Sequence, residues 1–199
     1  MLVFYKERLV LLSVPKTGTT AYQAALAPFA DMVISDPPDL KHAPLYRYNR
    51  FFRKMFEKVC NVDMETIAVM REPISWLGSW YRYRKRPFMS GKPNSTEHIS
   101  FDDFVSAYAK GDRPGYANVG SQAKFLEARP NGTNITHLFR YEDSAALDSF
   151  LKTRLGVDFT LELRNVSPRQ DLSLRPETIA KLRAKCGAEF DLYDNIPVR

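Results

Sequence analysis

Residues 9–20 read Leu9-Val10-Leu11-Leu12-Ser13-Val14-Pro15-Lys16-Thr17-Gly18-Thr19-Thr20, an apolar run followed by a short polar loop. The run at 9–12 has no polar alternation, which is typical of a parallel strand buried on both faces. Residues 21–26 favour a helix. Gly18 lets the backbone approach a ligand closely, and the N–H groups and dipole at a helix start favour negative charge. The stretch predicts a strand, an anion-binding loop and a helix.

The alternation of strand and helix recurs along the chain. We predict further strands at 31–35, 66–70 and 134–139, and helices at 46–58, from 74 onward, at 101–110, 120–128 and 142–155, and in a closing stretch at 172–193. Residues 1–8 are compatible with an edge strand or with an irregular lead-in. The pattern predicts an α/β fold with a parallel sheet flanked by helices. A length of 199 residues favours a single domain over 1–199.

The composition excludes a disordered protein and an integral membrane protein. Apolar residues make up 44% and charged residues 26%, a balance typical of soluble globular proteins. The net charge of +6 favours anionic ligands. Neither a signal peptide nor a membrane span is recognisable, so we expect a cytoplasmic protein. Cys60 and Cys186 lack metal-type neighbours, and we expect two reduced thiols and no metal site.

The loop departs from the Walker A pattern G-x-x-x-x-G-K-[ST], because Lys16 precedes Gly18. Its order resembles the 5′-phosphosulfate loop of sulfotransferases, which use 3′-phosphoadenosine 5′-phosphosulfate (PAPS). The resemblance implies a P-loop-like core. It also implies that the loop residues bind the cofactor, namely Pro15, Lys16, Thr17, Gly18, Thr19 and Thr20.

A second stretch, Arg71-Glu72-Pro73 followed by Ser79, resembles the 3′-phosphate motif of the same family. In that family the Arg at the strand end and the Ser eight positions later bind the 3′-phosphate, which implies this role for Arg71 and Ser79. A strand-end guanidinium and a hydroxyl two turns along the next helix suit one phosphate. The chain departs from the family at Trp76, where many members have a second Arg.

The resemblance extends to Tyr141-Glu142-Asp143 and to the closing stretch at 172–193. Ser167 and Arg169 lie where carbohydrate-type members have a loop that covers the nucleotide, so the resemblance implies that both contact the cofactor. An exposed Arg169 without a role remains an alternative.

The reaction implied is in-line transfer of the sulfuryl group to an acceptor hydroxyl or amine, with adenosine 3′,5′-bisphosphate leaving and no metal required. Lys16 would stabilise charge on the leaving phosphate. The candidate base is His42, which follows the second predicted strand in a Lys-His-Ala setting that resembles this family. We expect His137 to pack inside a strand and His98 to lie in a solvated loop.

Two other classes of function compete with this interpretation. One is a P-loop-like nucleotide kinase, which would need a magnesium site, although the strand at 66–70 is followed by Arg71. The other is a non-catalytic module that binds nucleic acid or acidic glycan through the basic run at 82–86. If the protein is an enzyme, residues 36–50 and 84–118 should shape a site for a small-molecule, lipid or carbohydrate acceptor, with no specific nucleic acid partner.

Overall fold

The computed structural model describes residues 1–162 and 172–198. In these residues β1 (Leu2–Phe4), β2 (Leu9–Leu11), β3 (Met32–Val33), β4 (Glu65–Met70) and β5 (His137–Arg140) form a five-stranded sheet in the order β3-β1-β2-β4-β5. β2, β4 and β5 are parallel, whereas β1 is antiparallel to both of its neighbours. The predicted α/β class with parallel strands is confirmed, but the sheet is mixed rather than wholly parallel.

The antiparallel pairing of β1 follows from the short connection between β1 and β2. Arg8 has a φ of 52° and its N–H donates to the Tyr5 carbonyl at 3.1 Å, which closes a tight hairpin turn. A parallel crossover would need a dozen or more residues. Residues 1–8 are therefore neither an irregular lead-in nor an edge strand, because β3 pairs with the other side of β1.

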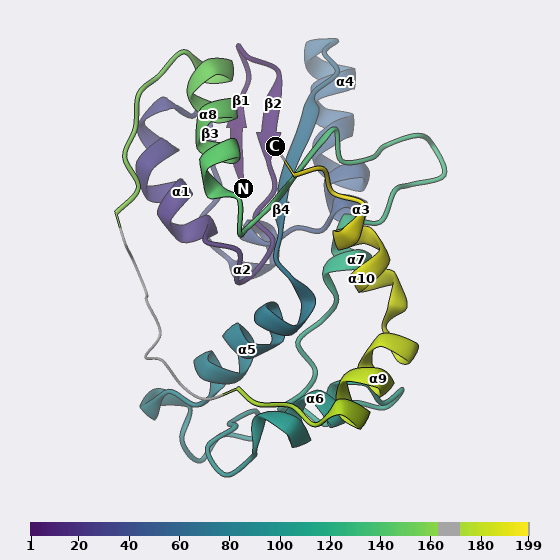
Figure 1. Cartoon of the computed structure of the whole chain (residues 1–199). Helices are drawn as coiled ribbons and strands as arrows, with labels where there is room; N and C mark the ends of the chain where they lie inside the picture. Colours follow the sequence, from purple (N-terminus) through teal and green to yellow (C-terminus); the bar gives the residue numbers. More distant parts are fainter. Residues whose placement is uncertain (163–171, 199) are drawn as a thin grey trace. The chain divides into compact units, whose positions relative to one another are not determined.

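The central strands are buried on both faces, as the uninterrupted apolar runs predict. All of β2 is buried, and so is β4 apart from Glu65. Helices α1 (Thr19–Leu26) and α8 (Ser144–Leu155) lie on one side of the sheet, and α3 (Leu45–Arg47) and α4 (Lys54–Cys60) lie on the other (Figure 1). The core beneath α1 and α8 includes Leu11, Tyr22, Leu26, Ile67, Leu147 and Leu151. Each such side chain contributes about 1.5–3 kcal/mol when it is fully buried.

The remaining helices follow the predicted order, with local differences. They are α2 (Pro38–Lys41), the π-helical turn η2 (Tyr48–Arg53), α5 (Pro73–Arg84), α6 (Phe101–Tyr108), α7 (Gln122–Leu126), α9 (Pro176–Lys185) and α10 (Gly187–Asp194), with short 3₁₀ turns η1 (Ala27–Phe29) and η3 (Pro87–Met89). The closing helix predicted at 172–193 is divided between α9 and α10, since the chain leaves helical geometry at Cys186, before Gly187. β5 begins at 137 rather than 134.

The chain divides into two compact units. The first comprises 1–71, 122–162 and 196–198 of the described residues, and the second comprises 72–121 and 172–195. The first contains the sheet. The second has its own apolar cluster, which includes Trp76, Leu77, Tyr81, Phe104, Leu182 and Phe190. The single domain over 1–199 stays a prediction. Across the described residues, no helix combines the length and apolar character needed to cross a membrane.

Candidate functional site

The loop after β2 has an unusual backbone. Lys16 and Gly18 have φ values of 68° and 74°, and Thr17 between them is not in the left-handed region. Such alternation curls the chain so that successive N–H groups face a common concavity suited to an anion. A left-handed conformation costs a residue with a side chain roughly 1–2 kcal/mol. Strain at Lys16, which glycine would avoid, is typical of functional loops.

Helix α1 begins directly after this loop, with Gly18 as its N-cap and no acidic residue in its first turn. The first N–H groups of a helix have no acceptor within it, so they are available to an anion. Thr20 is exposed at this end, whereas Thr17 is buried and its hydroxyl donates to the Val14 carbonyl at 2.9 Å. Thr17 therefore uses its side chain to hold the turn and can offer a ligand only its backbone.

Arg71 and Tyr141 lie beside the same loop. Arg71 follows β4, which pairs with β2, and Tyr141 follows β5, which pairs with β4. The carboxyl ends of these three parallel strands meet at one edge of the sheet. The Arg71 guanidinium lies 4.4 Å from the centre of the Tyr141 ring, and its Nη1 is 3.5 Å from the Lys16 carbonyl oxygen. A Cβ on Gly18 would lie 3.2 Å from the Tyr141 ring. The tyrosine thus packs against both the loop and the guanidinium.

Gln122, at the start of α7, holds the backbone of Arg71 in place. Its Oε1 accepts from the Arg71 N–H at 3.0 Å, and its Nε2 donates to the Arg71 carbonyl at 2.8 Å. The side chain is fully buried. Sequence reasoning missed this residue, because its partner lies 51 positions away and no local pattern distinguishes Gln122 from the other polar residues around it.

Gln122→Met keeps the approximate volume of the side chain but leaves two backbone groups of Arg71 without their partners. We expect the free energy of unfolding to fall by about 2 kcal/mol or more, since an unsatisfied buried polar group costs about 1–3 kcal/mol. Urea denaturation measures the change. Gln23→Met is the matched control, because the buried Nε2 of Gln23 donates no hydrogen bond among the described residues. An equal loss in both variants would contradict the role of Gln122.

His42 follows α2 and reaches back to Ser13, which lies between the end of β2 and the loop. Its Nδ1 lies 2.7 Å from the Ser13 carbonyl oxygen, which can only accept, so this nitrogen carries the proton of the neutral ring. Nε2 is then the acceptor. Burial lowers the pKa of His42, and the positive charges of Lys41 and Lys16 lower it further, against the opposing effect of the Ser13 hydrogen bond. The ring is therefore held neutral at pH 7.

The other two histidines lie in a strand and in a loop, as the sequence predicts, but His137 is half-buried rather than packed in the core. His137 is in β5, and its Nε2 is 2.9 Å from Oε2 of Glu65, which Arg154 also contacts at 2.9 Å. His98 is exposed in a turn-rich loop. Neither belongs to the set of Arg71, Tyr141 and the loop at 15–20.

The second unit contains Ser79 and Trp76, both on α5. Ser79 is half-buried. Trp76 is buried and packs edge to face against Trp80 and Tyr108, with ring centres 6.2 and 6.3 Å apart. Its place in an apolar cluster explains why an indole suits a position where the family often has an Arg. The pairing of Ser79 with Arg71 stays a prediction, and Ser167 and Arg169 lie outside the described residues.

The basic run at 82–86 is not a uniformly exposed surface. Arg84 is buried, and its Nη1 and Nη2 donate to the carbonyls of Gly115 and Asn118 at 2.6 and 3.1 Å. Burial lowers its pKa. The Arg84 guanidinium therefore holds the loop at 115–118.

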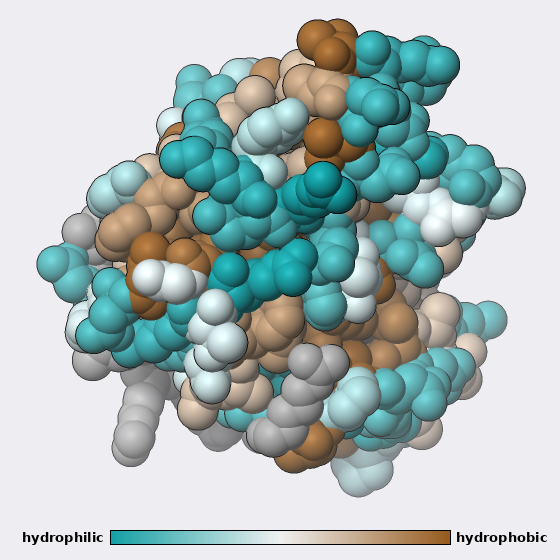
Figure 2. Space-filling model, turned by 90° about the horizontal axis from the view of Figure 1, so that it is seen from above, coloured by the Kyte–Doolittle hydropathy of each residue, from teal (hydrophilic) through white to brown (hydrophobic). Residues whose placement is uncertain are grey.

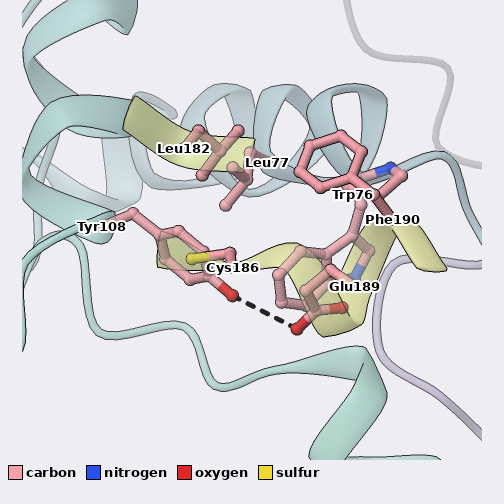
Figure 3. Close-up of a pocket in the computed structure, with 8 residues that line it drawn as sticks. Trp76, Leu77, Tyr108, Leu182, Cys186, Glu189 and Phe190 are labelled. Carbon is pink, nitrogen blue, oxygen red and sulfur yellow. Dashed lines mark hydrogen bonds between the residues drawn. The ribbon is translucent and has the colours of Figure 1, made fainter. Parts of the chain in front are cut away.

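A small pocket in the second unit is lined by Pro73, Trp76, Leu77, Tyr108, Leu182, Cys186, Glu189 and Phe190. Figure 3 shows the apolar side chains converging and the Tyr108 hydroxyl directed at Glu189, with Oε1 3.5 Å away. The same hydroxyl donates to the Gly120 carbonyl at 3.0 Å. These contacts identify the pocket as part of the packing of the second unit.

No protein-family model matches the sequence, and no curated protein sequence matches it significantly. The assignment of a function therefore rests on the residues of the site.

Proposed function

We propose that the protein is a PAPS-dependent sulfotransferase with a P-loop-like core, which transfers a sulfuryl group to a hydroxyl or amine of a glycan, lipid or small molecule. One observation carries the proposal: Arg71 and Tyr141 lie against a loop whose alternating backbone leads into the start of α1. This arrangement collects N–H donors and a guanidinium at the ends of three parallel strands. Such donors fit a ligand with several anionic groups.

In this proposal the loop binds the 5′ end of the donor. Backbone N–H groups between Lys16 and Thr20 surround the phosphosulfate, and the hydroxyl of Thr20 adds a side-chain donor at the exposed helix start. Gly18 has no side chain, so the ligand can approach the backbone without displacing Tyr141. Arg71 provides the charge for the 3′-phosphate, with Ser79, Ser167 and Arg169 as further proposed contacts.

The chemistry assigned to the site requires a group to stabilise the leaving phosphate and a base. As the bond from sulfur to the bridging phosphate oxygen breaks, a bond forms between sulfur and the acceptor oxygen or nitrogen. Lys16 stabilises the electron pair left on the phosphate. His42 takes the acceptor proton at Nε2, since Nδ1 donates to Ser13.

The observations favour this activity over the two rivals. A kinase would need a carboxylate at the end of β4 to hold magnesium, but the residue that follows β4 is Arg71. For a nucleic acid or glycan module based on residues 82–86, Arg84 is committed to two carbonyls of its own unit.

We predict that the protein binds adenosine 3′,5′-bisphosphate at least about tenfold more tightly than AMP. A charge-assisted hydrogen bond contributes roughly 1.5–3 kcal/mol, and 1.4 kcal/mol corresponds to a factor of ten. Arg71→Ala should remove most of this preference and leave AMP binding nearly intact. Titration calorimetry with both nucleotides measures the ratio.

Arg129→Ala is the control for this prediction, since Arg129 pairs with Glu127 on the surface of the same unit. It removes the same charge and should keep the preference. Equal affinities of the native protein for the two nucleotides would exclude the proposed 3′-phosphate site.

A further inference from the structure

One outward face of the helical segment at 45–60 carries two rows of exposed side chains. Residues four positions apart lie on one side of a helix, so each row has a spacing of four and the two rows run side by side. The basic row is Arg50, Lys54 and Lys58, and the apolar row is Phe51, Met55 and Val59. The apolar side chains are 57%, 36% and 79% exposed. These three apolar side chains are therefore exposed rather than packed in the core.

The opposite face of the segment already anchors it to the first unit. Leu45, Tyr48 and Phe56 are buried. The side-chain oxygen of Asn49 accepts from the Asn131 amide at 3.0 Å and the Thr133 hydroxyl at 2.8 Å. The fold therefore does not need the exposed apolar row for its own packing.

The charge on the exposed face is almost entirely positive. Glu57 is the only acidic residue in 45–60, and it pairs with Arg53. Among the described residues the basic row makes no ion pair. The Arg50 guanidinium lies 5.3 Å from the Phe51 ring centre. Cations and apolar side chains therefore occupy a single surface of the segment. Figure 2 shows hydrophobic residues among hydrophilic ones on the upper face of the molecule.

We propose that this face binds the surface of an anionic lipid bilayer. Phe51, Met55 and Val59 would enter the boundary of the acyl chains while the basic row meets the lipid phosphates, as in helices that lie in the membrane interface. A nucleic acid would use the cations but would leave the apolar row in water. The proposal does not depend on the sulfotransferase assignment.

Sedimentation with vesicles tests the proposal. The full chain should bind vesicles of phosphatidylcholine with phosphatidylglycerol and should bind pure phosphatidylcholine far more weakly. Replacing Arg50, Lys54 and Lys58 with Gln should lower binding on the order of a hundredfold, because each cation contributes about a fivefold factor near an anionic surface.

The matched control replaces three exposed lysines of the second unit, Lys110, Lys181 and Lys185, with Gln and changes the net charge equally. This variant should bind almost as the native chain does. An equal loss in both triple variants would overturn the proposal, because binding would then reflect the overall charge of +6.

The apolar row has its own test. Phe51→Ser with Val59→Ser should lower binding to anionic vesicles by about tenfold or more. Cys60 is exposed next to Val59 and can carry an environment-sensitive fluorophore in a Cys186→Ser background. We expect a blue shift on anionic vesicles. An unchanged circular dichroism spectrum must first show that each variant is folded. Full binding by the folded double variant, or a probe whose emission does not shift, would then contradict the insertion of this face into the bilayer.

Discussion

His42→Ala is expected to lower the rate of sulfuryl transfer by about a hundredfold to ten-thousandfold, the range that a positioned general base contributes. The Ser13 carbonyl orients the ring through Nδ1 at 2.7 Å and leaves Nε2 to accept the acceptor's proton. Affinity for adenosine 3′,5′-bisphosphate should stay nearly unchanged, because the ring acts on the acceptor. Initial rates with labelled PAPS and calorimetry on the same preparation measure the two quantities.

His98→Ala is the control for this variant, since His98 is exposed in a loop and should be replaceable without loss of rate. Circular dichroism and the melting temperature must first show that the His42 variant is folded. Near-normal turnover in a folded His42→Ala protein would contradict its role as base. The exposed Glu142, which follows β5, would then be the residue to replace next.

The rate should also depend on pH with a defined sign. Only the neutral ring accepts a proton, so the rate falls as pH drops through the pKa of His42. Burial, with the nearby charges of Lys41 and Lys16, lowers that pKa from its ordinary value of 6.5. The acid limb of the kcat/KM profile, which reports the free enzyme, should therefore lie below pH 6.5 and should vanish in His42→Ala. An acid limb centred above pH 6.5 would contradict the assignment.

Lys16→Ala is expected to lower the turnover rate by about a hundredfold or more, as loss of a donor to the transition state commonly does. Nucleotide affinity should fall far less, because the loop N–H groups and Arg71 hold the ligand. The comparison of kcat with the dissociation constant of adenosine 3′,5′-bisphosphate separates the two effects. An equal fall in both would make Lys16 an anchor and contradict its action on the leaving group.

The backbone at Lys16 supplies a control for this experiment. Its φ of 68° suits glycine, so Lys16→Gly removes the ammonium and also relieves the strain. We expect the Gly variant to be more stable than the Ala variant by about 1 kcal/mol, with the same loss of turnover. Different turnover rates in the two variants would mean that loop geometry, rather than the charge, limits the reaction.

The sequence alone predicted the elements that depend only on residues close together in the chain. The apolar runs at 9–12 and 66–70 predicted buried parallel strands because a strand covered on both faces needs no polar alternation. Gly156 ends α8 in the left-handed conformation expected of a glycine cap. The loop at 15–20 and Arg71 were recognisable as candidates from residue type and position alone.

The tertiary structure decided what depends on partners far away in the chain. β1 lies inside the sheet because β3 covers its outer edge, and no pattern in residues 1–8 contains that information. Gln122 holds Arg71 through two hydrogen bonds across 51 positions, and Tyr141 meets Gly18 only because β2, β4 and β5 are parallel neighbours. Hydrophobic periodicity and helix capping depend on residues a few positions apart, so they can be read from the sequence. The hydrogen bonds of Gln122 and the contact between Tyr141 and Gly18 depend on the order of the strands, so they appear only when the sheet is assembled.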